Sequence, residues 1–253
     1  MSNNTISNMK MLNINTTYPT LGIVTFTSAG YVELTQNLCN SNIQNNVNFN
    51  INIFCLDDTS FTHNYGESTK NVKFFSDNND SGHEESMMRQ DSENFGSLMV
   101  KKFEIIYKGL NEFEHLLYID GDIVIKKDFI EELTYNYKYK DIVFQDDKRP
   151  SKPNQINLCA GFMLIKSNKK MLKFFNPENI PTDLFEKYKT HDQTYINKSK
   201  NKFNYNILSL DSFPNGPKYY ENHKSLDPSI IHFNYVRGEE KISLMKEYKE
   251  WYF

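Results

Sequence analysis

Short apolar runs alternate along the chain with segments of helical periodicity. The β-branched and aromatic run at 21–27 predicts a strand, and Tyr31, Leu34 and Leu38 follow it at helical spacing behind a candidate cap, Ser28. The same pattern predicts further strands at 49–57, 71–75, 115–119, 141–144, 158–166, 207–210 and 229–236. Strands that alternate with helices are typical of a mainly parallel α/β sheet, which binds ligands beyond the carboxyl ends of its strands.

The clearest amphipathic helix is predicted at 95–110, where six apolar residues recur on one face: Phe95, Leu98, Met99, Phe103, Ile106 and Leu110. Shorter helical segments are expected at 168–175 and 183–198 and at the C-terminal end. Residues 76–92 have no apolar period, so we expect a loop there.

The bulk composition is that of a globular protein with one sizeable core. The chain has 253 residues, of which 38% are hydrophobic, and we expect a flexible arm at 1–18 followed by a single domain at 19–253. The net charge of -3 and the pI near 6.1 provide no long-range field for nucleic acid or an anionic membrane. Nucleic acid is therefore not expected as a partner.

The cysteines and the hydropathy pattern bear on the compartment. Cys39, Cys55 and Cys159 are odd in number and far apart, which argues against a disulfide framework and favours a reducing compartment. No stretch of about eighteen apolar residues is present, so no membrane span is expected. The N-terminal residues lack an apolar export signal, and the expected location is cytoplasmic.

The run HLLYIDGDIVIKKDF at 115–129 contains two carboxylates, Asp120 and Asp122, between apolar segments. Strands disfavour Asp and Gly, and like charges this close repel, so a divalent cation is the natural compensation. Gly121 between them adds no side chain and leaves room for a nucleotide. The alternative is a simple turn, because all three residues are turn formers, although apolar flanks make a surface turn less natural.

A second group of candidate residues follows the strand predicted at 229–236. His232 offers an imidazole that suits Mn²⁺, Gly238 can present its N–H to a phosphate, and Lys241 can neutralise a phosphate oxygen. Each residue alone is commonly structural. Together with Asp120 and Asp122, they indicate a site for a metal ion and a diphosphate.

The stretch LLYIDGDIVIKKDF resembles the Asp-X-Asp strand of the GT-A glycosyltransferases, specifically of the nucleotide-diphospho-sugar transferase family that includes plant xylosyl- and arabinosyltransferases. From about residue 20 to the end, further segments resemble the family's motifs in order: GIVTFTSAGYVELTQN, FCLDDTSF, CAGFMLIKSN, HDQTYIN and HFNYVRGEEK. The resemblance implies a Rossmann-like GT-A domain that uses Mn²⁺ or Mg²⁺. It also implies transfer of a sugar from a nucleotide diphosphate, with UDP expected, to a hydroxyl of a glycan or glycoconjugate, with retention of configuration.

The resemblance also implies roles for individual residues. Asp122 and His232 are the expected metal ligands, and Asp120 is expected to contact the metal or the donor ribose. Residues expected to bind the donor nucleotide are Thr25, Thr27, Tyr31, Asp57, Lys102, Gly238 and Lys241. Asp192 and Gln193 are expected to line the donor sugar and to act in catalysis.

Structural alternatives stand beside several of these roles. Thr25, Thr27 and Tyr31 can equally serve strand and cap packing, Asp58 can replace Asp57 as the base contact, and Thr190 or Asp192 can cap a helix. Cys159 departs from the family, which often has Asn there. The alternating tyrosines of TYNYKYK are read as a half-exposed strand edge: Tyr135, Tyr137 and Tyr139.

Two other functions compete with sugar transfer. An aspartate-nucleophile phosphohydrolase would use Asp120 as the nucleophile and Asp122 as acid and base, and Val124 fits its local motif. That function leaves the first strand, the Asp-Gln segment and the His-Gly-Lys region unexplained. The other is a nucleotide-sugar or glycan-binding protein on an inactive transferase scaffold.

Overall fold

The computed structural model describes residues 20–66, 71–75, 93–180 and 192–253. The arm expected at 1–18, the loop expected at 76–92 and the first part of the helix expected at 183–198 lie outside these ranges. Within the described ranges, none of the helices combines the length and the apolar character needed to cross a bilayer.

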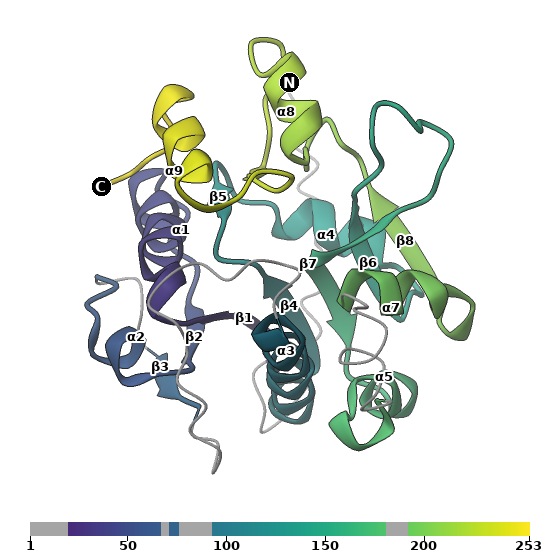
Figure 1. Ribbon diagram of the computed structural model, residues 1–253. Coiled ribbons are helices and arrows are strands. Elements are labelled where there is room, and N and C mark those ends of the chain that lie inside the picture. The colour runs from purple at the N-terminus through teal and green to yellow at the C-terminus, as the bar shows by residue number, and fades with distance from the viewer. Residues whose placement is uncertain (1–19, 67–70, 76–92, 181–191) are drawn as a thin grey trace, which may run out of the picture.

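The core is a seven-stranded sheet with the order β3-β2-β1-β4-β7-β6-β8 (Figure 1). Its strands are β1 (Leu21–Thr27), β2 (Ile51–Cys55), β3 (Asn71–Phe74), β4 (His115–Ile119), β6 (Ile142–Asp146), β7 (Leu158–Lys166) and β8 (Tyr205–Leu208). β7 runs antiparallel to β4 and β6, whereas the other neighbouring pairs are parallel. The predicted mainly parallel α/β fold is confirmed, and each strand overlaps a predicted one, although β8 begins and ends two residues before the strand predicted at 207–210.

A second, two-stranded sheet joins the middle of the chain to its C-terminal part. β5 (Ile123–Ile125) pairs antiparallel with β9 (Ile230–His232), and Ile123 lies opposite His232. Both strands are buried along their whole length. This register places the residues just before β5 next to His232.

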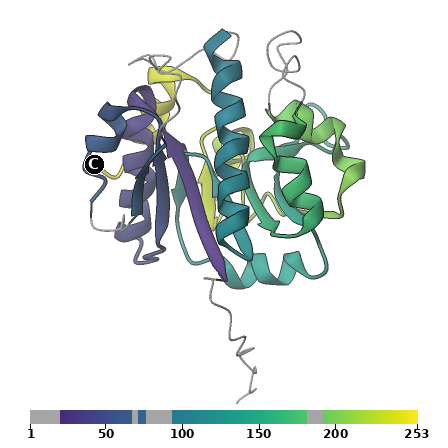
Figure 2. The ribbon, with the colours of Figure 1, turned by 90° about the horizontal axis from the view of Figure 1, so that it is seen from below.

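Helices cover both faces of the large sheet. In the described residues these helices are α1 (Val32–Gln44), α2 (Asp58–Thr62), α3 (Glu93–Glu112), α4 (Ile130–Tyr137), α5 (Lys169–Phe175) and α7 (Asp192–Lys198), whereas α8 (Gly216–Asn222) and α9 (Gly238–Glu247) pack on the small β5–β9 sheet. Short 3-10 turns are η1 (Ala29–Tyr31), η2 (Pro177–Asn179) and η3 (Lys200–Lys202). The long helix α3 lies across one face of the sheet (Figure 2), where Leu98, Phe103, Ile106 and Leu110 are buried as its periodicity predicts.

The strand edge predicted for the alternating tyrosines is wrong. Residues 130–137 form helix α4, because Phe129, Leu133 and Tyr137 recur at helical spacing and the first two are fully buried. Tyr135 and Tyr139 are more than four-fifths exposed, and Tyr139 has a positive φ of 65° beyond the helix end. The spacing of the tyrosines therefore does not indicate a strand here, because the segment forms a helix that buries one face.

The C-terminal segment is fastened to α1, beside which α9 lies in Figure 1. The buried Asn37 donates to the Glu250 carbonyl over 3.0 Å and accepts from the Tyr252 backbone N–H over 2.6 Å. Lys126 pairs with the Glu250 carboxylate at 2.7 Å. These contacts fix the segment that follows α9 and thereby the helix that carries Lys241.

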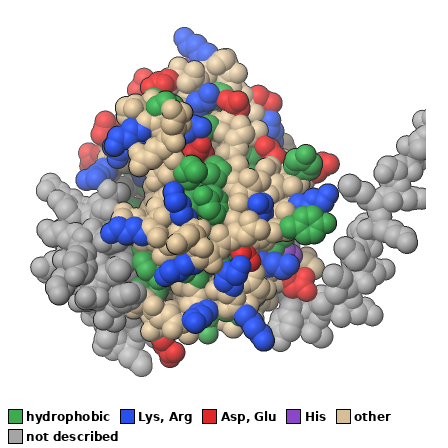
Figure 3. All heavy atoms as spheres, turned by 90° about the vertical axis from the view of Figure 1, so that its right-hand side faces the viewer, with side chains coloured by type: hydrophobic (Ala, Val, Ile, Leu, Met, Phe, Trp, Pro, Cys, Tyr) green, Lys and Arg blue, Asp and Glu red, His purple; other side chains and the backbone are tan. Residues whose placement is uncertain are grey.

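The surface carries charges of both signs. On the face shown in Figure 3, Lys and Arg side chains are scattered among Asp and Glu, and hydrophobic side chains gather in separate small groups. This distribution agrees with the small net charge of -3.

Candidate active site

The Asp120-Gly121-Asp122 segment is a tight turn at the carboxyl end of β4, where Ile123 donates to the Asp120 carbonyl over 3.3 Å. The turn that the sequence offered as one alternative is present, and it lies between two buried strands rather than in a surface loop. A Cβ on Gly121 would lie 2.7 Å from the Thr35 hydroxyl of α1. The glycine therefore lets α1 approach the turn closely.

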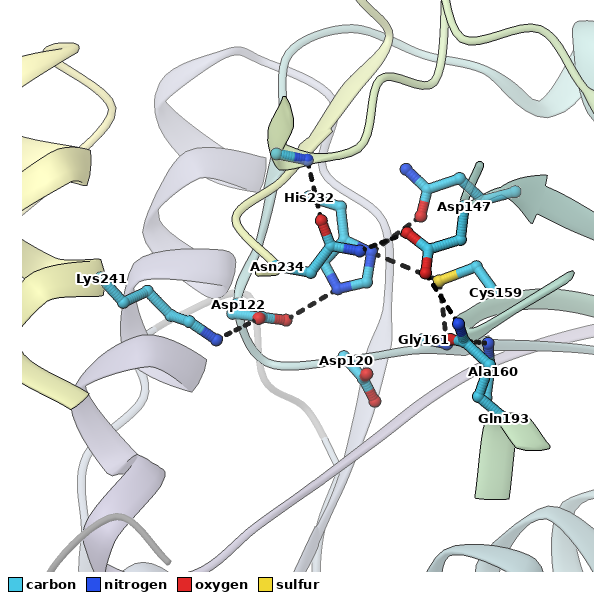
Figure 4. Close-up of polar contacts among 12 residues, drawn as sticks. Asp120, Asp122, Asp147, Cys159, Ala160, Gly161, Gln193, His232, Asn234 and Lys241 are labelled. Carbon is cyan, nitrogen blue, oxygen red and sulfur yellow. Dashed lines mark hydrogen bonds and ion pairs between the residues drawn. The ribbon is translucent and has the colours of Figure 1, made fainter. Parts of the chain in front are cut away.

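Asp120, Asp122 and His232 converge as the sequence predicts. Each offers a ligand atom, and these atoms all lie within 4.8 Å of one another. Asp122 Oδ1 lies 3.2 Å from His232 Nε2 (Figure 4), and apart from this ion pair the buried oxygen has no partner among the described residues. Two carboxylates with an imidazole are a donor set that Mn²⁺ accepts. The residues fit a divalent cation.

Asp122 is neutralised by two neighbouring cationic groups. Lys241 Nζ lies 2.5 Å from Asp122 Oδ2, and Figure 4 shows Asp122 between Lys241 and His232. Burial opposes ionisation of Asp122, but Lys241 and His232 hold its pKa well below the usual range. Burial likewise lowers the pKa of His232, but the Asp122 carboxylate raises it well above the ordinary value. In the protein alone, Lys241 and His232 thus supply the positive charge that Asp122 requires.

Asp120 belongs to a second ion-pair group on the other side of the turn. Its Oδ1 accepts from the Tyr118 hydroxyl over 2.7 Å and lies 3.1 Å from Lys102 Nζ. Lys102 also pairs with Asp192 at 2.8 Å and stands 4.6 Å from the Tyr118 ring centre. Burial favours the neutral amine, but Asp120 and Asp192 raise the pKa of Lys102 above its ordinary value. The buried tip predicted for Lys102 is present and links two predicted site residues.

Gly161 of β7 lets the sheet approach the metal-ligand candidates. A Cβ at this position would collide with the Asp120 carboxylate and the His232 ring. The Gly161 carbonyl also accepts the Asp120 backbone N–H over 2.8 Å. Only glycine leaves enough space here for both side chains.

A cavity of about 1210 Å³ opens over these groups. Ten of the sequence-predicted site residues line it: Thr27, Tyr31, Lys102, Asp120, Asp122, Asp192, Gln193, His232, Gly238 and Lys241. Gly238 has a positive φ of 56° and begins α9, so the N-terminus of this helix lies at the cavity wall.

Thr25 and Asp57 do not line the cavity. Thr25 is fully buried within β1. The Asp57 carboxylate caps α2 by accepting from the Ser60 N–H and also accepts from the Ala29 N–H, each over 2.7 Å. Asp57 therefore ties the end of β2 to the segment that follows β1.

Asp147, which follows β6, was not singled out in the sequence. It is 4% exposed, and its carboxylate is surrounded by side-chain donors, several of which appear in Figure 4. The donors are Gln193 at 2.7 Å, Asn234 at 2.8 Å, Tyr235 at 3.1 Å, Asn157 at 3.2 Å and Asn215 at 3.4 Å. The sequence feature that could have indicated Asp147 is a pair of aspartates after an apolar run, which resembles the pattern that indicated Asp120 and Asp122.

Gln193 is fixed at both ends of its amide. Its Nε2 donates to Asp147, and its Oε1 accepts the Ala160 backbone N–H over 3.3 Å. Asp192 is the first residue of α7 as described and pairs with Lys102. Cys159 Sγ, where the resembled family often has Asn, lies 3.6 Å from His232 Nδ1.

Comparisons with known proteins agree with this geometry. The family model for nucleotide-diphospho-sugar transferases matches residues 47–245. The UDP-galactose:fucoside alpha-3-galactosyltransferase of Dictyostelium discoideum is 26% identical over 227 residues, with coverage of 73% of this chain and 33% of that protein. The chain therefore spans about a third of the length of this curated relative.

Solved structures share the fold. The galactosyltransferase LgtC, crystallised with donor and acceptor sugar analogs, superposes with a TM-score of 0.57 at 14% identity over 89% of this chain and 95% of LgtC. A glycosyltransferase involved in glycosylation of the major capsid of PBCV-1 gives 0.57 at 12% identity, over 90% of this chain and all of that chain. At these identities the likeness establishes a common GT-A architecture.

Proposed function

The chain belongs to the nucleotide-diphospho-sugar transferase family, and on that premise we propose that it transfers a sugar from a UDP-sugar to a hydroxyl of a glycan or glycoconjugate. The proposal includes dependence on Mn²⁺ or Mg²⁺ and retention of anomeric configuration. The observation that carries it is the convergence of Asp120, Asp122 and His232 at one cavity, where their ligand atoms all lie within 4.8 Å of one another.

Asp120, Asp122 and His232 would hold the divalent cation. Carboxylate oxygens suit Mn²⁺ and Mg²⁺ alike, and the imidazole favours Mn²⁺. The bound cation would neutralise the negative charge that develops on the departing nucleotide diphosphate. Lys241, which now pairs with Asp122, would then be released to bind a phosphate oxygen.

The N-terminus of α9 supports the assignment of Gly238 and Lys241 to the diphosphate. Backbone N–H groups at a helix N-terminus, together with the helix dipole, favour anions. Gly238 and Lys241 both line the cavity from this end of α9. Thr27 and Tyr31 line it at the end of β1, where we place the ribose and the base.

Asp192 and Gln193 are proposed to face the donor sugar. Both line the cavity, and Gln193 is held by Asp147 and Ala160 in a single orientation. Such fixed polar groups stabilise positive charge at the anomeric carbon without reorganisation. We propose that retention arises by same-face attack: the acceptor hydroxyl bonds to the anomeric carbon on the side from which the nucleotide diphosphate departs, and the departing phosphate takes up the hydroxyl proton.

The named relative suggests where to begin with substrates. It is a UDP-galactose:fucoside galactosyltransferase, so UDP-galactose is the first donor to test and a fucoside the first acceptor. Because the chain spans only a third of that protein, both substrates are part of the proposal. Family membership favours transfer over an aspartate-nucleophile phosphohydrolase, in which Asp120 would have to leave Lys102 and Tyr118.

The proposal is tested with a panel of nucleotide sugars. UDP-galactose, UDP-glucose and UDP-xylose are incubated with the protein and Mn²⁺, with and without a fucoside, and released UDP is measured. We expect metal-dependent release that EDTA abolishes and that excess Mn²⁺ restores. Binding of UDP-sugars without any release would instead identify a catalytically inactive binding protein, and hydrolysis of simple phosphate esters would favour the phosphohydrolase.

A further inference from the structure

Gln145, at the end of β6, contacts a candidate metal ligand from behind the cavity. It is fully buried, and its Oε1 lies 2.7 Å from His232 Nδ1. Its Nε2 donates to the carbonyls of Phe213 and Pro214 over 3.1 and 3.0 Å. Gln145 is not among the described residues that line the cavity, and its side chain contacts the candidate metal site at His232.

The two carbonyls determine which end of the amide faces the histidine. A carbonyl oxygen only accepts hydrogen bonds, so the NH₂ group of Gln145 must face Phe213 and Pro214. Its oxygen then faces His232 and can only accept, which requires a proton on Nδ1. A cation on the side of Asp120 and Asp122 then meets Nε2, which gives up the proton it shares with Asp122 when the cation binds, whereas Nδ1 keeps its own proton on Gln145.

The same backbone carbonyl holds both residues in register. The Pro214 oxygen accepts from Gln145 Nε2 and, over 3.2 Å, from the backbone N–H of His232. The other neighbour of Nδ1 is Cys159 Sγ, at 3.6 Å, a weaker acceptor that also receives the Gly161 N–H. The shorter contact to a better acceptor makes Gln145 the dominant partner of Nδ1.

We propose that Gln145 is a positioning residue that presents Nε2 of His232 to the divalent cation of the proposed transferase. This inference rests on the proposed metal site. Partners of a metal-bound histidine commonly change metal affinity by about 10–100-fold when they are removed. Gln145→Met keeps the length of the side chain but removes the acceptor, so we expect Mn²⁺ binding without nucleotide to weaken by about 10–100-fold.

A second variant separates positioning from general stability. Gln145→Glu keeps an oxygen for the Nδ1 proton but turns its other oxygen toward the Phe213 and Pro214 carbonyls, where it is repelled. We expect Gln145→Glu to unfold at a lower temperature than Gln145→Met and yet to bind Mn²⁺ more tightly. A purely structural role predicts that affinity follows stability, with Gln145→Glu the weaker binder.

The experiment combines calorimetry of Mn²⁺ binding, thermal unfolding and pulsed electron paramagnetic resonance of bound Mn²⁺ with ¹⁵N-labelled histidine. Asn42→Leu is the matched control, because it removes a buried amide paired with the Phe49 backbone, away from the cavity. We expect the directly bound histidine nitrogen in the wild type and the control, and a reduced signal in Gln145→Met.

The outcomes distinguish the two levels of the proposal. A wild type that binds Mn²⁺ through histidine, together with an unchanged Gln145→Met variant, would overturn the positioning role alone. A wild type that binds no Mn²⁺, with or without UDP, would overturn the metal site and this inference with it.

Discussion

Two carboxylates on either side of His232 in Figure 4, Asp122 and Asp147, are both largely buried but have opposite kinds of neighbours. Asp122 is paired with Lys241 and His232, which are cationic. The donors that surround Asp147 are amides and a phenol from four separate segments. In the proposed function, Asp122 exchanges these partners for a metal ion, whereas Asp147 holds one wall of the cavity through neutral donors.

The largest effect is expected for Asp122→Asn, which removes the negative charge that we propose binds the metal ion. The amide is a poor ligand and no longer attracts a cation, so kcat/KM for the preferred UDP-sugar should fall by about 10²–10³-fold. UDP affinity with Mn²⁺, measured by calorimetry, should fall to the value without metal. Asp227→Asn changes a surface carboxylate that is 96% exposed and is the control. Unchanged UDP affinity in Asp122→Asn would refute the assignment.

The second-largest effect is expected for Gly161→Ala, because its new methyl group would collide with both Asp120 and His232. A displacement of about 1 Å at such a site commonly costs about 10²-fold in rate, and we expect Mn²⁺ affinity to fall as well. Gly109→Ala, whose Cβ would meet the Leu116 side chain, is a control for overpacking away from the cavity. Equal Mn²⁺ affinities in the two variants would show that the glycine serves packing alone.

Asp147→Asn tests the other side of the comparison. It places an NH₂ group against donors such as Gln193 and Asn234, which should cost about 1–3 kcal/mol of stability. We expect kcat to fall by about 10–100-fold as Gln193 loses its orientation, with Mn²⁺ affinity unchanged. Asp146→Asn, at a neighbouring carboxylate that pairs with Lys148, is the control. A loss of Mn²⁺ affinity in Asp147→Asn would erase the distinction between the two carboxylates.

The smallest and most specific effect is expected for Lys241→Met, which removes the cation that competes with the metal for Asp122. Mn²⁺ alone should bind about tenfold more tightly, equivalent to about 1.4 kcal/mol, while UDP should bind more weakly with Mn²⁺ present. Lys246→Met on the same helix, where Lys246 lies over the Trp251 ring, is the control. Weaker binding of Mn²⁺ alone would contradict the exchange of Lys241 for metal.

Local sequence patterns predicted the strands of the large sheet and several residues at strand ends, but not all of the helices. The apolar runs coincide with the strands, and Asp120, Asp122 and His232 stand at the ends of such runs. Helix α4 was missed because tyrosines two residues apart imitate strand alternation, whereas the deciding stripe begins earlier at Phe129. Whether such a segment forms a strand or a helix depends on which of its side chains can pack against the rest of the core. The segment alone does not contain that information.

The sequence did not identify the residues that contribute to the site through contacts with distant parts of the chain. Gln145 touches His232, and Asp147 touches Asn234 and Gln193, all of which come from other parts of the chain. These contacts depend on the antiparallel placement of β7 and on the pairing of β5 with β9. Asp57 is the opposite case: the sequence predicted that this carboxylate at a strand end binds the nucleotide, but in the structure it caps a helix.

The most direct test of the central claim is a crystal structure with Mn²⁺ and UDP, using anomalous scattering to locate manganese. We predict one manganese peak within bonding distance of Asp120, Asp122 and Nε2 of His232, with Lys241 moved from Asp122 to the diphosphate. UDP bound in the cavity with no manganese at these three residues, and Lys241 still paired with Asp122, would contradict the account.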